Sequence, residues 1–214
     1  MWIKTSIIFV IVVTYWGYAL VQDEYKYSQA ISLNERGNIL IGLKRYGYAI
    51  KNYREAISLN HEYADAYNNL ANALKHKGKL DEAISNYKKA IKYNHSLSDA
   101  YSNYGIALSE KGSYKDAIQH YRKALEFNPY LYSAHNRIAI LLNQEGDVGN
   151  AISHYQEAIT LYPDFAKAHN NLGTAFAGQR RFEEAIKLFE KAIDINPNYT
   201  DARNNLELAR SLLK

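Results

Sequence analysis

The chain has 214 residues, of which 47% are hydrophobic, and it contains three prolines, eleven glycines and no cysteine. This composition excludes a disordered or collagen-like chain, and the lack of cysteine excludes disulfides, thiolate metal sites and thiol nucleophiles. The net charge of +4 comes mostly from interleaved acids and bases, without the continuous basic stripe that nucleic-acid binding normally needs, so no nucleic-acid partner is expected.

The first predicted element is an uncharged segment near the N-terminus. Residues 5–21 carry no charge, Lys4 precedes them, and Asp23 and Glu24 follow. As a helix this segment would span about 26 Å, slightly less than a hydrocarbon core of roughly 30 Å. Tryptophan and tyrosine near its ends favour a membrane anchor, because these side chains collect at membrane interfaces. A short apolar core and a small-x-small pattern ending at Ala19 leave a cleaved signal peptide open as the alternative.

The flanking charges predict an orientation for this segment. Lys4 and the free N-terminus are expected to stay on the cytoplasmic side while the acidic flank crosses. Residues 1–24 are therefore interpreted as a membrane (signal) anchor or a signal peptide. The rest of the chain is expected on the non-cytoplasmic side, periplasmic or extracellular, or secreted if the signal is cleaved.

A 34-residue repeat follows and fills most of the chain. The sequence divides without insertion or deletion into five units, 30–63, 64–97, 98–131, 132–165 and 166–199. Counted from the first residue of each unit, position 8 is always glycine or alanine, and positions 20 and 27 are always alanine. Position 24 is always aromatic: Tyr53, Tyr87, Tyr121, Tyr155 and Phe189. Small side chains beside large ones predict helices whose backbones approach closely.

Each unit is predicted to form two helices, because its apolar positions follow a helical period in two runs. Gly78, Gly112 and Gly146 stand between the runs, where a left-handed cap ends the first helix. Lys44 and Arg180 replace this glycine in the first and fifth units. We therefore expect strain or a different turn geometry at those two positions.

Two departures mark the ends of the predicted repeat domain, residues 25–199. Arg36 occupies a normally apolar position of the first unit, where no preceding repeat would cover it. Residues 200–214 restart the first-helix pattern but place Glu207 and Arg210 at positions that are small or bulky and apolar elsewhere. They are predicted to form a solvating cap helix, which stacked repeats require at their ends.

This pattern resembles the tetratricopeptide repeat family, whose units have small residues at positions 8, 20 and 27, bulky ones at 4, 7, 11, 17 and 24, and proline at 32. Pro129, Pro163 and Pro197 occupy position 32 in the last three units, and the match extends over residues 30–199. The resemblance implies an all-α fold class, a right-handed superhelical solenoid of helix-turn-helix repeats after an N-terminal hydrophobic helix. It also implies that the first helices line an inner groove that contacts ligands.

Asparagines recur on one face of the predicted first helices. The frame AYNNLA at residues 66–71 returns once in each following unit and in the cap, as AYSNYG, AHNRIA, AHNNLG and ARNNLE. At about 100° per residue, positions 5 and 6 lie opposite the apolar positions, so these amides are predicted to face the groove. A primary amide matches the C=O and N–H of an extended peptide. The candidate peptide-binding residues are Asn34, Asn38, Asn68, Asn69, Asn72, Asn103, Asn136, Arg137, Asn170, Asn171, Asn204 and Asn205.

The amide series resembles the asparagine ladder in the repeat domain of O-linked N-acetylglucosamine transferases, which implies binding of peptide backbones. Arg137 interrupts the series and is expected to favour an acidic group in the ligand. Further specificity is expected from the residues around the amides, which are Lys75, His76, Asp99, Glu110 and Lys167. The residue set that binds acidic tails in chaperone-binding family members is incomplete, so that ligand is not expected. A structural role, in which the amides bond neighbouring helices, stays open.

The sequence carries no arrangement that indicates catalysis or a cofactor. The seven histidines show no metal-ligand spacing, and there is no phosphate loop, nucleophile elbow or Ser, His, Asp set. We therefore expect a non-enzymatic, membrane-tethered interaction scaffold, without metal or cofactor, that binds an extended peptide or a partner helix in its concave groove. The alternative is a structural subunit that self-associates, or packs through its convex face, in a larger membrane-associated assembly.

Overall fold

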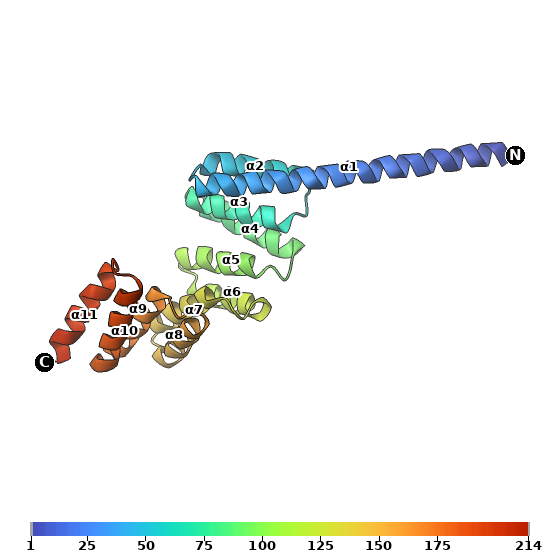
Figure 1. The fold of residues 1–214 in the computed structure, drawn as a ribbon. Helices are drawn as coiled ribbons and strands as arrows, with labels where there is room; N and C mark the ends of the chain where they lie inside the picture. The colour runs from blue at the N-terminus through green and yellow to red at the C-terminus, as the bar shows by residue number, and fades with distance from the viewer. Residues whose placement is uncertain (1, 214) are drawn as a thin grey trace. The chain divides into compact units, whose positions relative to one another are not determined.

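The structure, a computed structural model, describes the backbone of residues 2–213 and the side chains of residues 21–213. Every regular element in this range is an α-helix, and successive helices are joined by short turns (Figure 1). The helices are α1 (Trp2–Gly42), α2 (Tyr46–Leu59), α3 (Ala64–His76), α4 (Leu80–Tyr93), α5 (Ser98–Glu110), α6 (Tyr114–Phe127), α7 (Tyr132–Gln144), α8 (Val148–Leu161), α9 (Ala166–Gly178), α10 (Phe182–Ile195) and α11 (Thr200–Leu213). The predicted all-α class and helix-turn-helix organisation are thus confirmed.

The helix boundaries repeat with the period of the sequence. The odd-numbered helices from α3 to α11 begin at one constant interval, which equals the length of a sequence unit, and the even-numbered helices from α2 to α10 do the same. The chain divides into two compact units, Met1–Asn103 and Tyr104–Lys214. Each unit is built from helix pairs that pack against their neighbours in sequence.

Helix α1 joins the N-terminal segment to the first repeat. It continues without a turn past the predicted boundary at residues 24 and 25, and its part from Ala30 onward packs against α2 and α3 (Figure 1). Where side chains are described, no helix is both long enough and apolar enough to cross a membrane. Residues 5–20, nearly all of the predicted anchor, lie outside that part of the chain.

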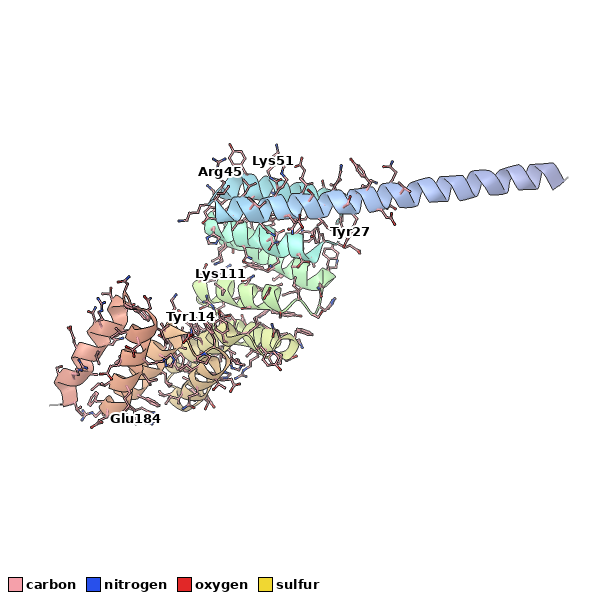
Figure 2. All side chains as sticks on the ribbon, viewed as in Figure 1. Tyr27, Arg45, Lys51, Lys111, Tyr114 and Glu184 are labelled. Carbon is pink, nitrogen blue, oxygen red and sulfur yellow. The ribbon has the colours of Figure 1, made fainter. Side chains whose placement is uncertain are left out.

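The core of each repeat consists of an aromatic ring packed against small residues. The rings of Tyr53 and Phe189 are each only 1% exposed. A Cβ atom added at Gly37 would lie 2.3 Å from Cε1 of Tyr53, so the two helix backbones can approach this closely only without that atom. The outer faces of the second helices carry exposed charges such as Lys51 and Glu184 (Figure 2). Size and polarity together therefore set which face of each helix is buried.

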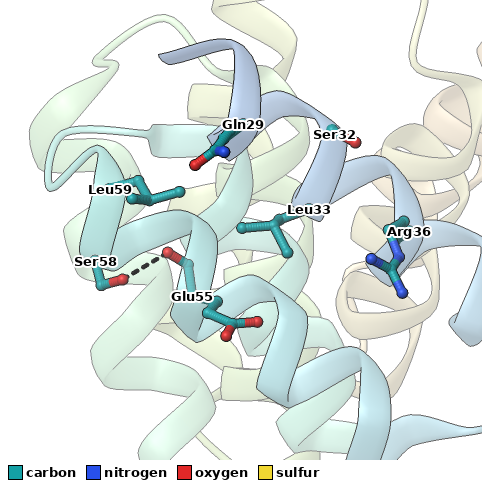
Figure 3. Close-up of a pocket in the computed structure, with 7 residues that line it drawn as sticks. All are labelled: Gln29, Ser32, Leu33, Arg36, Glu55, Ser58 and Leu59. Atoms are coloured by element: carbon teal, nitrogen blue, oxygen red, sulfur yellow. Dashed lines mark hydrogen bonds between the residues drawn. The ribbon is translucent and has the colours of Figure 1, made fainter. Parts of the chain in front are cut away.

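The first repeat leaves one side of its helix pair open. Gln29, Ser32, Leu33, Arg36, Glu55, Ser58 and Leu59 line a hollow of about 420 Å³ between α1 and α2 (Figure 3). Arg36 is exposed there, whereas Leu70, at the same position one repeat later, is buried. A charged side chain is tolerated at this position because no repeat packs over it in the described chain.

The turns inside the repeats share one backbone geometry. Gly78, Gly112 and Gly146 have φ angles of 74°, 83° and 85°, and Lys44 and Arg180 adopt φ angles of 55° and 61°. The two replacements therefore keep the left-handed turn and bear the predicted strain, because a Cβ in this conformation crowds the following carbonyl oxygen. The alternative expectation, a different turn geometry, is wrong.

Replacing Arg180 by glycine is expected to raise the free energy of unfolding by about 1 kcal/mol, because glycine removes this crowding. Urea denaturation followed by circular dichroism measures the change. Gln179→Gly is the matched control, since Gln179 precedes Arg180 and has an ordinary φ of −88°. That control should lower stability, because glycine there adds freedom to the unfolded chain and removes the Gln179 Oε1 that accepts a hydrogen bond from Arg181. Equal effects of the two variants would contradict the assignment of strain to Arg180.

Candidate functional site

The paired asparagines form hydrogen bonds between successive first helices. In each case the position-6 amide donates from Nδ2 to Oδ1 of the position-5 amide one repeat earlier. The bonds are Asn69 to Asn34 (3.0 Å), Asn103 to Asn68 (3.1 Å), Asn171 to Asn136 (3.1 Å) and Asn205 to Asn170 (3.0 Å). All four lie within one or other compact unit. The amides thus connect neighbouring repeats.

The two positions of each pair differ in burial. The position-5 residues Asn34, Asn68, Asn136 and Asn170 are 6–7% exposed. The position-6 residues Asn69, Asn103, Asn171 and Asn205 are half-buried, and Arg137 and Asn204 are exposed. The position-5 side chains are therefore not open to solvent in the repeats, and their assignment to the groove face stays a prediction. The angular argument treats one helix alone, whereas the next first helix covers the position-5 side chain.

The asparagines at position 9 have a different partner. Asn38 and Asn72 accept hydrogen bonds from the hydroxyls of Tyr53 (2.8 Å) and Tyr87 (2.6 Å) in the second helix of the same repeat. Burial raises the pKa of Tyr53 to about 12, so its hydroxyl remains a donor throughout the physiological range. These two amides position buried rings in the first unit.

Arg137 lies at a hollow in the second unit. The hollow measures about 240 Å³ and is lined by Ser133, Asn136, Arg137, Ile140, Phe165, Lys167, Asn171 and Tyr199. Burial raises the pKa of Tyr121 to about 12, and the positive charge of Arg137 partly offsets this rise. Both Arg137 and Lys167 are exposed, so their charges are available to a ligand.

The structure brings only some of the predicted residues together. Asn136, Arg137, Lys167 and Asn171 meet at this hollow. His76 stacks on the ring of Tyr46, with 4.8 Å between centroids, in the first unit. The remaining lining residues, Ser133, Ile140, Phe165 and Tyr199, were not predicted. The sequence does carry a signal for Phe165 and Tyr199, because position 34 is aromatic or leucine in every repeat.

Asn136→Ala is expected to lower the free energy of unfolding by about 1–2 kcal/mol, because it leaves the Asn171 amide without its partner between helices. The matched control is Asn204→Ala. Asn204 occupies the same repeat position but is exposed, and it should change stability by at most about 0.5 kcal/mol. Thermal and urea unfolding of both variants measure the difference. A loss as large for Asn204→Ala as for Asn136→Ala would contradict a structural role for the buried amides.

A pair of histidines joins α7 to α8 in the second unit. Nδ1 of His135 lies 3.0 Å from Nδ1 of His154, so one neutral ring donates to the other. Burial lowers the pKa of both rings, and the charge of His135 and then that of Arg122 lower the pKa of His154 further. Glu157 opposes these effects. The neutral state of the pair is thus favoured by folding.

The lowered pKa values of His135 and His154 predict that the protein is less stable in acid. Folding lowers both pKa values below the ordinary 6.5, so the unfolded chain binds more protons than the folded chain below that pH. The contribution of the neutral histidine pair to the free energy of unfolding is fully present above pH 6.5 and is lost as the pH falls. The urea midpoint should therefore drop between about pH 7.5 and about pH 5, and His154→Gln should make this drop smaller. An unchanged pH dependence in the variant would contradict the assignment.

Comparison with known families assigns the repeats. Three family descriptions match: "Tetratricopeptide repeat" over residues 166–199, "Tetratricopeptide repeat" over 62–129, and "TPR repeat" over 37–78 and 140–180. The chain is a tetratricopeptide repeat protein. The matched ranges cover residues 37–129 and 140–199, from the end of α1 to α10, with a gap at the start of α7. Of the four asparagine pairs, only Asn103 and Asn68 lie wholly within these ranges, and Asn136 and Arg137 fall in the gap.

Solved structures with the same fold include two proteins of similar length. YrrB, described as "a TPR protein with an unusual peptide-binding site", is 26% identical, with a TM-score of 0.66, and the alignment covers 83% of this chain and 92% of YrrB. The protein pilF of Pseudomonas aeruginosa is 16% identical, with a TM-score of 0.75, and the alignment covers 88% of this chain and 92% of pilF. At that identity pilF supports the fold alone. A comparison with curated proteins found no match.

Proposed function

We propose that this tetratricopeptide repeat protein is an interaction scaffold that binds an extended peptide along the groove face of its first helices. The observation that carries the proposal is the half-buried amide of Asn171 beside Arg137 in an open hollow. One N–H of this amide is used by Asn136, and a primary amide has two, so one donor remains for a ligand backbone. The peptide-binding site named for YrrB supports the same role for this fold.

The spacing of the first helices suits an extended ligand. Packed helices lie about 10 Å apart and an extended peptide advances about 3.3 Å per residue, so a position-6 amide would meet roughly every third ligand residue. We assign the buried position-5 amides a positioning role, because each accepts a bond from the position-6 amide that would contact the ligand. A right-handed superhelix, implied by the family resemblance, would make this face concave.

Selection of peptides from a random displayed library tests the proposal. Peptides of about 12 residues would reach across three or four first helices. Immobilised full-length chain should enrich specific sequences, and Thr174→Trp should weaken their binding about tenfold. Thr174 is exposed at position 9 of α9, the groove-face position that Ile140 occupies one repeat earlier. Gln156→Trp, at an exposed position of α8, is the matched control and should have no effect. A failure to enrich any sequence, or equal effects of the two variants, would contradict the proposal.

We also propose that residues 5–21 tether the scaffold to a membrane, with the repeats on the non-cytoplasmic side. The support is the uncharged length of this segment, its aromatic flanks, and the change from Lys4 to Asp23 and Glu24 across it. The chain should then resist alkaline carbonate extraction of membranes. Ile11→Arg should release it, because a charge at the middle of a span costs about 3 kcal/mol, whereas Ile11→Leu should not. A chain that is extracted without any substitution, or a mature N-terminus beyond residue 21, would exclude a retained anchor.

A second candidate function is a structural subunit that self-associates. Two surfaces favour it: the open hollow between α1 and α2 (Figure 3), and the exposed side chains of Leu208 and Leu212 on α11. Sedimentation velocity at increasing concentration tests it without any ligand. This function predicts oligomers that Leu208→Glu with Leu212→Glu disperses. A monomer at every concentration would exclude it and leave the peptide-binding scaffold.

A further inference from the structure

The fourth and fifth repeats carry cations at positions 6 and 2 of their first helices, where the other repeats have none. Position 6 is asparagine in every described repeat except the first, with Glu35, and the fourth, with Arg137. Position 2 is lysine only in the fifth repeat, at Lys167. The sequence places these two cations in different repeats, and the structure brings both to the hollow of about 240 Å³.

The two cations have unused capacity to bind an anion. The positive charge of Arg137 lowers the pKa of the neighbouring Tyr121 hydroxyl, and its planar guanidinium carries five N–H donors that suit a carboxylate. Lys167 makes no ion pair within the part of the chain whose side chains are described. The charge of Glu110 raises the pKa of Tyr121, and the charge of Asp201 raises the pKa of Tyr199. No carboxylate is among the residues that line the hollow. Charge complementarity therefore favours a negative group at this point.

Apolar side chains lie beside this charge. Ile140 and Phe165 line the same hollow, and both are half-buried. Position 9 is asparagine in the first two repeats, where Asn38 and Asn72 hold buried tyrosines, but Ile140 takes this place in the fourth. A ligand that fills the hollow would thus need both a negative group and apolar surface. A free inorganic anion supplies only the first.

We propose that this hollow recognises an aspartate or glutamate side chain of an extended peptide, next to an apolar residue that packs on Ile140 and Phe165. The proposal rests on the peptide-binding function above and names the ligand chemistry of that groove. The carboxylate accepts hydrogen bonds from Arg137 and from the remaining N–H of Asn171, and Lys167 adds a second positive charge. A volume of about 240 Å³ suits one or two side chains rather than a drug-sized ligand. Because both cations are exposed, the interaction should weaken as salt is added.

The same displayed library tests this inference, now through the composition of the enriched peptides. Sequences selected on the full-length chain should share an acidic residue next to an apolar one. A synthetic peptide of an enriched sequence should bind about tenfold more tightly than its copy with glutamine in place of the acid. The double variant Arg137→Gln, Lys167→Gln should remove this difference.

A control of equal charge separates a local site from a general field. Lys187→Gln with Lys191→Gln changes the net charge equally on α10, where both lysines are exposed. This control should retain the preference for the acidic peptide. Equal weakening by both double variants would overturn the inference, since it would show attraction by net charge only.

The outcomes also separate this inference from the function on which it rests. Enriched peptides without acidic residues, weakened by Thr174→Trp but not by the Arg137 and Lys167 substitutions, would overturn the inference and support the peptide-binding function. A library from which no sequence is enriched would overturn both. An acidic preference that is lost only in the Arg137 and Lys167 variant would support both.

Discussion

Replacing Phe189 by alanine is expected to lower the free energy of unfolding by about 3–5 kcal/mol. The ring is fully buried on α10 and fills the space against Gly173 on α9, where even an added Cβ would lie 2.7 Å from ring atom Cε1. Alanine would leave a cavity that the two close helices cannot fill without shifting their backbones. Urea denaturation of the full-length chain, followed by circular dichroism, measures the loss.

Phe127→Ala is the control for this prediction. Phe127 ends α6 and is 41% exposed, so its removal should cost less than about 1 kcal/mol. Phe189→Leu should fall between the two alanine variants, because leucine keeps part of the buried volume. If Phe189→Ala and Phe127→Ala had similar effects, the close packing of α9 and α10 would be wrong.

The second large effect is expected for Gly37→Ala in α1, which should lower the free energy of unfolding by about 1–3 kcal/mol through overpacking. The added Cβ would lie 2.3 Å from Cε1 of Tyr53. The ring has little freedom to move, because it is buried and its hydroxyl donates to Asn38. The clash should therefore outweigh the gain of about 1 kcal/mol that alanine brings to a helix. Thermal and urea unfolding measure the net change.

Two further variants isolate the clash. Gly42→Ala lies in the same helix with no atom within 4 Å of its added Cβ, so it should be neutral or stabilising by up to about 1 kcal/mol. In a Tyr53→Leu background, Gly37→Ala should lose its penalty, and the resulting double-mutant cycle should show a coupling of about 1 kcal/mol or more. A penalty that persists without the tyrosine would place its cause elsewhere.

The periodic part of the fold could be predicted from the sequence because it depends on local physics. Apolar residues at helical spacing and alanine at positions 20 and 27 define helices that pack closely, and the helix starts observed from α3 to α11 keep the interval of the sequence repeat. The turns were predicted less completely. The sequence shows that Lys44 and Arg180 replace glycine, but only the backbone shows that they keep positive φ angles.

The candidate site could be predicted only in part, because its polar groups depend on neighbouring helices. A single-helix projection places positions 5 and 6 on the same side, yet Asn136 is buried under the next repeat whereas Asn171 is half-buried. Likewise, Arg137 was expected to prefer an acidic group. The presence of Lys167, Ile140 and Phe165 around the same hollow follows from the offset between adjacent repeats, which no single helix contains.

The sequence by itself determined the helices, their pairing and the small-against-large contacts, since each of these depends on residues that recur at the same place in every unit. Only the tertiary structure decided which amides link the repeats and how far each amide is buried. The physical reason is that burial of a polar side chain depends on the surface of the adjacent helix. Asn136 and Asn204 share a repeat position, but only Asn136 is covered by a following first helix.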